Sequence, residues 1–266
     1  SHLRPPPSTT FGTSSNNSNS IVNDDLKILL YITSHWSEQH EVFLELCWPK
    51  VLQNVRLVQM ADVAVFLTCE NSSTAKLETI LATLKQTFPG KNVTVFNHGP
   101  AGYQDGAILA LSEAAKHDYF AGYDWVIRLN PDVLIQDDTW ILETMQHDSN
   151  ASLIYINCWE EDSAIVRVHT DFFAVKPSAL PPKALLQEQQ DQNAEKAFTK
   201  AVWPLIENHQ GRPIPGARPK KWHRCRVESG PVIHFHHFPI VTMRYFRSIP
   251  VLNRFVCPAE FKSYMA

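Results

Sequence analysis

The 266-residue sequence lacks several features that would assign it to a common class of protein. It has no internal repeat and no apolar run near the roughly 20 residues that a membrane-spanning helix needs. Its formal net charge of −3 comes from mixed signs, so the composition creates no general field for nucleic acid. Its five cysteines show no C-x-x-C or other zinc-type spacing. We therefore expect neither a membrane-spanning chain, nor a basic nucleic-acid-binding domain, nor a zinc module.

What the sequence does contain indicates one folded domain behind a polar leader. Residues 1–22 are rich in Ser, Thr, Asn and Pro, and so little apolar content predicts a disordered stem or linker. The whole chain is 44% hydrophobic and 11% aromatic, which is enough for a sizeable core. We expect residues 23–266 to form a single domain.

Short apolar runs alternate with amphipathic segments along that domain in a βαβ manner. Strands are predicted at residues 27–33, 63–68, 93–96, 125–129, 153–157, 168–175 and 231–237. Helices are predicted at residues 40–51, 73–87, 102–115 and 188–207, and a Pro- and Arg-rich loop at 209–221. This order predicts an α/β fold with a Rossmann-like, mostly parallel central sheet flanked by helices.

The strand at 125–129 ends abruptly in a polar tip, Asn130-Pro131-Asp132. In open α/β sheets ligands collect at the carboxyl ends of strands. Because side chains alternate along an extended chain, Arg128, Asn130 and Asp132 are expected to project toward one side. A guanidinium, an amide and a carboxylate in one crevice suit a pyrophosphate with its metal. The alternative is an ordinary turn, since Asn, Pro and Asp all favour turns.

The tip resembles the Asp-x-Asp motif of GT-A glycosyltransferases, which use sugar nucleotides as donors, with Asn130 in place of the first Asp. The resemblance implies a nucleotide-binding half at 23–133 and an acceptor half at 134–266. It leaves Asp132 as the only charged metal ligand in the tip. Near the end of the chain, Val232-Ile233-His234-Phe235 resembles the late His that completes the metal site in this family. His234 is therefore the second predicted ligand, with His236 as the alternative, for Mn²⁺ or Mg²⁺.

Two further segments are candidates for nucleotide binding. The loop at 97–107 is rich in glycine and leads into a helix, whose amino end offers unpaired N–H groups and a positive dipole. The first strand ends in hydroxyl side chains. A loop that only turns a corner is the commoner explanation of such glycines, although the position one element before Asp132 favours nucleotide binding. The hydroxyls are equally explained as a helix cap. The nucleotide contacts that the resemblance implies are Thr33, Ser34, Asn97, Gly102, Gln104, Arg128 and Asn130.

Asp171 is the candidate catalytic carboxylate, because it is flanked by apolar strand residues that can alter its pKa. It is preferred over the acidic segment at 160–162, which also suits a solvated turn. Arg128 is the candidate catalytic cation that neutralises the leaving group, together with a basic run between residues 212 and 226. That run is equally compatible with a solvated loop or a docking patch for an anionic acceptor.

As a whole, these features predict a metal-dependent glycosyltransferase that moves a sugar from a nucleoside diphosphate sugar to an acceptor hydroxyl. The resemblance favours a UDP-linked donor and a glycan or glycoprotein acceptor. Two alternatives stay open: a sugar nucleotidyltransferase, and a carbohydrate- or nucleotide-binding domain with little or no turnover. Against the first, no Gly-rich phosphate loop follows the first strand.

Four Asn-x-Ser/Thr sequons begin at Asn16, Asn71, Asn92 and Asn150. With the polar leader, they predict the lumenal part of a Golgi or other secretory-pathway protein, of type II topology, whose membrane anchor lies outside this sequence. One or two disulfides are expected there. Chance sequons in a cytosolic enzyme are the alternative.

Overall fold

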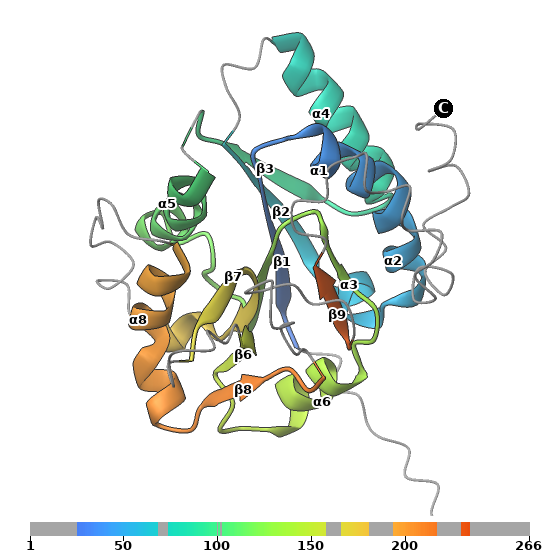
Figure 1. Cartoon of the computed structure of the whole chain (residues 1–266). Coiled ribbons are helices and arrows are strands. Elements are labelled where there is room, and N and C mark those ends of the chain that lie inside the picture. The colour runs from blue at the N-terminus through green and yellow to red at the C-terminus, as the bar shows by residue number, and fades with distance from the viewer. Residues whose placement is uncertain are drawn as a thin grey trace, which may run out of the picture.

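The computed structural model describes residues 26–68, 74–99, 101, 103–157, 166–180, 194–216 and 230–234. At its centre is a seven-stranded sheet with the order β3-β2-β1-β4-β7-β6-β8 (Figure 1). The strands are β1 (Ile28–Ser34), β2 (Asp62–Leu67), β3 (Val93–Asn97), β4 (Trp125–Leu129), β6 (Leu153–Asn157), β7 (Val168–Val175) and β8 (Gly211–Pro213).

The pairing in this sheet is mostly parallel. Strands β3, β2, β1 and β4 run parallel to one another, β7 is antiparallel to both β4 and β6, and β6 is parallel to β8. A second, two-stranded sheet pairs β5 (Val133–Ile135) with β9 (Val232–His234) in antiparallel fashion. The predicted α/β class with a mostly parallel central sheet is confirmed.

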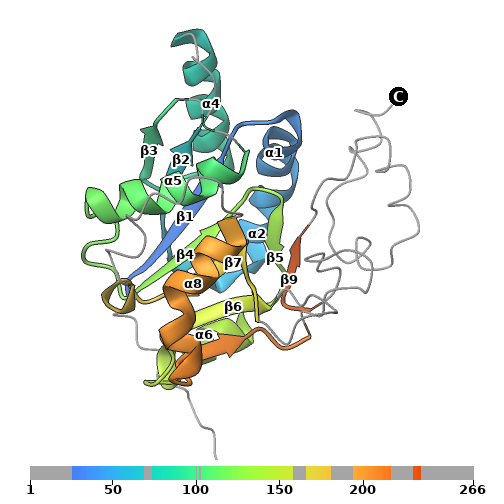
Figure 2. The same cartoon turned by 60° about the vertical axis from the view of Figure 1, so that its left-hand side comes forward.

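Helices cover both faces of the sheet (Figure 2). One face of β1 packs against α5 (Tyr103–Lys116) and α8 (Ala194–Glu207). The other face packs against other helices and the small sheet. The helices of this core are η1 (Phe43–Cys47), α2 (Trp48–Asn54), α3 (Arg56–Met60), α4 (Thr74–Thr87) and α6 (Thr139–His147). Helix α1 (Glu38–Val42) leads directly into η1, and a short 3-10 helix, η2 (Pro177–Ala179), follows β7. None of the described helices is long and apolar enough to cross a bilayer.

The helix predicted at 40–51 is three consecutive segments in the structure. A π-helical turn, η1, separates α1 from α2, and Pro49 lies in the first turn of α2. Proline has no N–H to donate to the carbonyl four residues earlier, and its ring crowds that carbonyl. The regular helical ladder is therefore interrupted just before α2. Cys47, in this turn, is disulfide-bonded, as the sequence led us to expect.

Sequence and structure agree best on the strands. Those predicted at 125–129, 153–157 and 168–175 are confirmed residue for residue. The prediction of a loop at 209–221 is partly wrong, because residues 211–213 form β8. Strand β5 and helix α6 were not predicted at all. The helix predicted at 188–207 is described from residue 194 onward.

The order of the strands creates a switch point between β1 and β4. From β1 the chain moves outward to β2 and β3, and it then returns to add β4 on the opposite side of β1. The two crossovers leave a crevice at the carboxyl ends of β1 and β4, which is where open α/β sheets bind ligands. Ser34 ends β1 and Asn130 follows β4, so the polar tip lies at this crevice.

Candidate metal centre

The tip after β4 is a tight turn whose backbone is held by hydrogen bonds to two of its carbonyl groups. The N–H of Val133 donates to the carbonyl of Asn130 at 3.0 Å, and β5 begins at once. The indole Nε1 of Trp48 donates to the carbonyl of Pro131 at 2.8 Å. Trp48 is fully buried and packs against Phe88. These two hydrogen bonds fix the backbone of the tip and therefore the positions from which its side chains project.

Asp132 lies inside this site, with only 6% of its surface exposed. Its Oδ2 accepts a hydrogen bond from Gln39 Nε2 at 3.3 Å and lies 3.8 Å from His234 Nε2. Its Oδ1 lies 3.7 Å from His40 Nε2 and accepts no hydrogen bond from the described residues. Helix α1 supplies both Gln39 and His40, neither of which the sequence had singled out. The two predicted ligands, Asp132 and His234, are therefore brought together.

Asp171 reaches the same place from β7, the antiparallel neighbour of β4. Its Oδ1 accepts hydrogen bonds from Asn130 Nδ2 at 2.8 Å and from Arg128 Nη1 at 3.3 Å. Its backbone carbonyl accepts a hydrogen bond from the N–H of Asn130 at 3.1 Å. Arg128 is 2% exposed and its guanidinium contacts Asp171 from within the sheet. The predicted catalytic pair is thus an ion pair at the base of the site.

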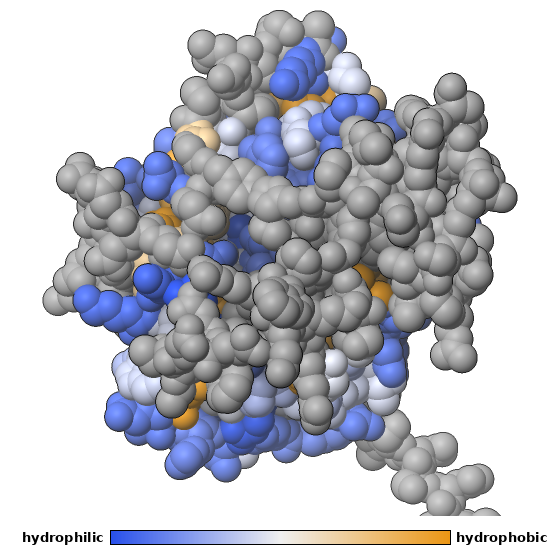
Figure 3. All heavy atoms as spheres, viewed as in Figure 1, coloured by the Kyte–Doolittle hydropathy of each residue, from blue (hydrophilic) through white to orange (hydrophobic). Residues whose placement is uncertain are grey.

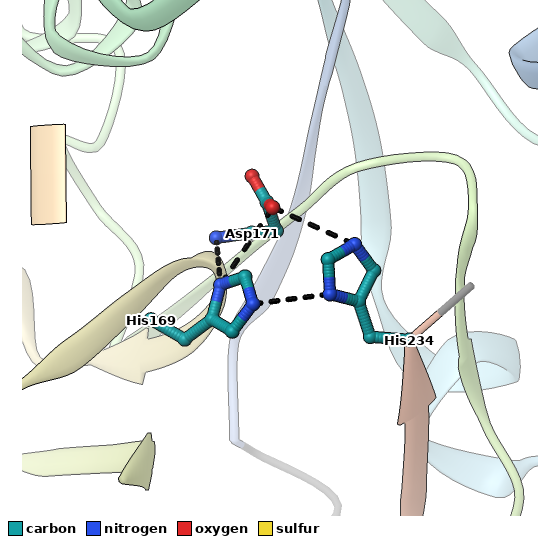
Figure 4. Close-up of side chains that lie close together, drawn as sticks. All are labelled: His169, Asp171 and His234. Carbon is teal, nitrogen blue, oxygen red and sulfur yellow. Dashed lines mark hydrogen bonds and ion pairs between the residues drawn. The ribbon is translucent and has the colours of Figure 1, made fainter. Parts of the chain in front are cut away.

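Two histidines complete the cluster (Figure 4). His169 Nε2 lies 3.0 Å from His234 Nδ1, and the rings are nearly perpendicular. The N–H of Asp171 donates to His169 Nδ1 at 3.0 Å. With neutral rings, this order of donors puts a proton on His169 Nε2 and another on His234 Nε2, which faces Asp171 Oδ2 at 3.5 Å. A neutral imidazole binds a cation through its unprotonated nitrogen, so binding at His234 Nε2 would require the other tautomer of His234, with the proton on Nδ1, and a rearranged contact with His169.

Burial and charge act together on the ionisable groups of the centre. Burial, and next the charge of Asp171, raise the pKa of Asp132 well above its usual value. Burial lowers the pKa of Arg128, while Asp171 opposes that shift. A cation beside a carboxyl group favours its ionised form and so lowers a pKa that burial has raised. The ionised form of Asp132 would therefore be stabilised by a cation bound beside it.

The donor set matches a divalent cation. Atoms of His169, Asp171 and His234 all lie within 4.8 Å of one another, and Asp132 Oδ2 approaches the same His234 Nε2 at 3.8 Å. Carboxylate oxygen and imidazole nitrogen are donors that Mn²⁺ accepts, whereas Mg²⁺ prefers oxygen. Asp132 Oδ1 is a buried carboxylate oxygen without a hydrogen bond. Buried polar atoms normally have a partner, and a bound cation would supply one here. The residues present fit such an ion.

The end of β1 forms one wall of the centre, and its hydroxyls are engaged with protein groups. Thr33 Oγ1 donates to Asn130 Oδ1 at 2.9 Å. Ser34 Oγ lies 3.0 Å from His40 Nδ1 and accepts a hydrogen bond from the N–H of Trp36 at 2.9 Å. Trp36 has a positive φ of 52°, which a bulky residue adopts at a cost of about 1–3 kcal/mol. The surrounding contacts thus hold a strained turn directly beside the predicted ligands.

The predicted nucleotide loop lies farther along the same sheet edge. Asn97 is exposed at the end of β3, two strands from β1, which corresponds to roughly 10 Å at normal strand spacing. Gly102 and the side chain of Gln104 lie outside the described residues. At Gly106 an added Cβ would lie 3.2 Å from Thr68 Oγ1, so this glycine lets α5 approach the end of β2.

Of the arginines and lysines in the predicted basic run, Arg212 is the one that the structure describes. Its Nε donates to Asp148 Oδ2 at 2.7 Å. Through β6 and β7 the register places Arg212 level with Ile127, three residues before the tip and three strands away. Arg212 therefore supports the far edge of the sheet. The rest of the run, the acidic segment at 160–162 and His236 lie outside the described residues.

The described residues visible on the face shown in Figure 3 are largely hydrophilic. Among the described residues, the large hydrophobic side chains that are exposed belong to Leu81 and Trp203. The apolar content of the sequence is thus used mainly in the two cores that flank the sheet.

Because Trp48 supports the tip, its removal should disturb the centre. Trp48→Ala is expected to lower the free energy of unfolding by about 3–5 kcal/mol, since it removes a fully buried aromatic side chain. Trp48→Phe keeps most of the packing and loses the hydrogen bond to Pro131, so its cost should be about 0.5–1.5 kcal/mol. Urea unfolding of both variants measures the two effects. Equal losses in both variants would contradict this division.

Comparisons with known proteins were made for sequence and for structure. No family model matches the sequence, and no curated protein matches it. Among solved structures, the chain is similar to the mannosyltransferase PcManGT from Pyrobaculum calidifontis in complex with GDP-Man and Mn²⁺, with 13% identity and a TM-score of 0.48. That match covers 75% of this chain and 60% of the mannosyltransferase, so the chain spans less than two thirds of that protein.

Two more structures illustrate the range of similar proteins. Mouse xyloside xylosyltransferase 1, in its apo form, is 12% identical with a TM-score of 0.48, and the match covers 80% of this chain and 99% of that one. A cytidylyltransferase from Leptospira borgpetersenii is 15% identical with a TM-score of 0.41, covering 75% and 79%. Nucleotide-sugar glycosyltransferases, which the tip resembles in sequence, are thus among the structures found. Similarity at this level carries no argument about function, which has to be argued from the centre itself.

Proposed function

We propose that the chain is a metal-dependent glycosyltransferase that transfers a sugar from a nucleoside diphosphate sugar to an acceptor hydroxyl. The observation that carries the proposal is the meeting of Asp132 and His234 at the switch point between β1 and β4. These residues come from segments about a hundred positions apart, and both are almost fully buried. Burying ionisable side chains together is costly, and such clusters are concentrated at functional sites.

In this proposal, Asp132 and His234 hold Mn²⁺ or Mg²⁺. When bound, such a cation supplies a positive charge that stabilises the departing nucleoside diphosphate. Trp48 and the turn at 130–133 keep Asp132 in place. Gln39 orients the Asp132 carboxylate through its hydrogen bond to Oδ2.

The remaining predicted roles are kept as parts of the proposal. The nucleotide is proposed to contact Thr33, Ser34 and Asn130. The hydroxyl of Thr33 holds Asn130 in position, and the hydroxyl of Ser34 holds His40. Asn97, Gly102 and Gln104 are kept as proposed contacts with the nucleotide. Arg128 acts through Asp171, which it contacts directly. A UDP-linked donor and a glycan or glycoprotein acceptor are the proposed substrates.

Turnover of a panel of sugar nucleotides, with and without Mn²⁺, tests this function. Metal-dependent release of nucleoside diphosphate is the expected result. Consumption of pyrophosphate with a sugar phosphate would instead identify a nucleotidyltransferase. Binding of a sugar nucleotide without turnover against any glycan acceptor would identify a binding domain, and either of these results would refute the proposal.

The proposed location is the lumen of the Golgi or another secretory compartment. The disulfide at Cys47 supports it, since disulfides persist in oxidising compartments. Two of the sequons lie in the described part of the chain, and both Asn92 and Asn150 are exposed there.

If the protein passes through the secretory pathway, Asn92 and Asn150 should carry N-linked glycans. Expression with a secretion signal in eukaryotic cells should then give a protein whose mass falls on treatment with an N-glycosidase. Asn92→Gln and Asn150→Gln should each remove one glycan, because each takes away one exposed acceptor amide. An unchanged mass in both variants would contradict the proposed modification at these sites.

A further inference from the structure

Position 130 is where this chain departs from the Asp-x-Asp pattern, and the structure gives the departure a physical reason. The amide of Asn130 is used at both ends. Its Oδ1 accepts from Thr33 Oγ1 at 2.9 Å, and its Nδ2 donates to Asp171 Oδ1 at 2.8 Å. An amide can accept and donate at once, whereas an ionised carboxylate can only accept. The site therefore requires an amide at position 130 for as long as position 171 carries an acid.

An acid at position 130 would place two carboxylates at hydrogen-bond distance. The atom that now donates to Asp171 Oδ1 from 2.8 Å would become an oxygen. Two carboxylates that share a site cannot both ionise without a strong shift of one pKa. Asn130 and Asp171 are thus complementary: one position holds the amide and the other holds the acid.

The orientation of Asp171 indicates what its acid does. Its Oδ1 is held by Asn130 and Arg128. Its Oδ2 points toward His234 and lies 3.5 Å from Nε2 (Figure 4). The same Nε2 faces Asp132 Oδ2 at 3.8 Å. One carboxylate oxygen from the tip and one from β7 thus lie within 4 Å of the same imidazole nitrogen.

We propose that Asp171 supplies the acid that the tip lacks, so that a divalent cation is bound by Asp132, Asp171 and His234. In this arrangement the second acid has moved from position 130 on the tip to the neighbouring strand β7. The proposal rests on the metal-dependent function proposed above and names a third ligand for that site. It also reassigns Asp171, which the sequence favoured as a catalytic carboxylate, to the metal.

His169 is the positioning residue of this set. Its Nε2 contacts His234 Nδ1 at 3.0 Å, and its Nδ1 accepts from the backbone of Asp171. His169 therefore links the two ligands that come from β7 and β9 and fixes the direction of His234 Nε2. A histidine that binds a metal commonly donates its second ring N–H to a neighbouring group, so in the metal-bound state His234 Nδ1 would be the donor in its contact with His169 Nε2.

A charge exchange between positions 130 and 171 tests the proposal. Four proteins are compared: the wild type, Asp171→Asn, Asn130→Asp and the double variant. Mn²⁺ affinity is measured by titration calorimetry and by electron paramagnetic resonance of free Mn²⁺, and folding by metal-free thermal unfolding. Asp148→Asn is the matched control, since it removes another carboxylate paired with an arginine, far from the centre.

Asp171→Asn should weaken Mn²⁺ binding by more than about 100-fold, because changes in groups that merely support ligands already cost roughly 10–100-fold. Asn130→Asp should lower the metal-free melting temperature, because it puts two acids at 2.8 Å. The double variant restores one amide and one acid with the polarity reversed. Its Mn²⁺ affinity should recover at least about 10-fold over Asp171→Asn, which is the non-additivity of coupled neighbours. Asp148→Asn should bind Mn²⁺ like the wild type.

Two results would overturn the inference while leaving the proposed function intact. The first is wild-type Mn²⁺ affinity in Asp171→Asn together with loss of affinity in Asp132→Asn, which would return Asp171 to the role of a catalytic carboxylate. The second is a double variant that binds Mn²⁺ no better than Asp171→Asn does. Full Mn²⁺ affinity in Asp132→Asn, His234→Ala and Asp171→Asn alike would refute the metal site itself, and the proposed function with it.

Discussion

Asp132→Asn is expected to abolish metal-dependent transfer while making the metal-free protein more stable. The variant loses the ionised oxygen that faces His234, and Mn²⁺ should no longer raise the melting temperature. A bound cation contributes several kcal/mol of charge stabilisation in such reactions, which corresponds to roughly 10²–10⁴-fold in rate. Sugar-nucleotide turnover and thermal unfolding with and without Mn²⁺ measure the two losses.

The gain in stability follows from the raised pKa of Asp132. An unfolded Asp has a pKa of about 3.9, and burial together with Asp171 raises the folded pKa well above it. Between these two values the folded protein holds a proton that the unfolded chain has released. Through this group, the free energy of unfolding therefore falls as the pH rises from about 4 to the folded pKa. Above the folded pKa this contribution no longer changes with pH.

An amide at position 132 does not titrate, so the variant should lack this fall. Metal-free Asp132→Asn should melt above the wild type at pH 8, and the difference should shrink toward pH 4. Asp148→Asn is the control, since Asp148 is held by Arg212 and its pKa is lowered rather than raised. A variant that melts below the wild type at pH 8 without metal would show that Asp132 is already stabilised as an anion by its neighbours.

Arg128→Met is expected to cost the largest amount of stability of any charge removal in the described chain. Arg128 is buried beneath the centre, and its Nη1 lies 3.3 Å from Asp171 Oδ1. Removing one partner of a buried ion pair leaves the other charge uncompensated, which typically costs about 3–5 kcal/mol. Urea unfolding at neutral pH measures this loss.

Two further variants separate charge from volume. Arg128→Met with Asp171→Asn removes both charges, so it should recover part of the loss. Arg212→Met removes a partly exposed partner of Asp148 and should have little effect. If Arg128→Met were no less stable than Arg212→Met, the ion pair with Asp171 would not be what holds the base of the site together.

The sequence was most informative where one element determines the outcome. Residues 125–129 are apolar except for Arg128 and end in a polar tip, and both features are local, so the strand and its end were predicted correctly. The pairing of Asp132 with His234 was predicted from a resemblance, and the two side chains do lie together. No spacing in the sequence could have shown this, because the late strand pairs with β5 and not with its neighbours in sequence.

The parts that were missed depend on contacts between distant segments. His169 and Asp171 alternate on β7 and so share a face, but only the fold brings His234 beside them. Gln39 and His40 lie at the start of the helix predicted at 40–51 and were not singled out, because only the fold places α1 against the tip. Strand β5 has only three residues, which is too few for a period of two to be seen.

The most direct test of the account is a crystal structure of the protein with Mn²⁺ and a nucleoside diphosphate, with the ion located by its anomalous scattering. We predict one Mn²⁺ within about 2.0–2.6 Å of carboxylate oxygens of Asp132 and Asp171 and of His234 Nε2, with the diphosphate on its open side. An ion held by other residues, or a diphosphate bound away from the switch point with no ion between these side chains, would contradict the account.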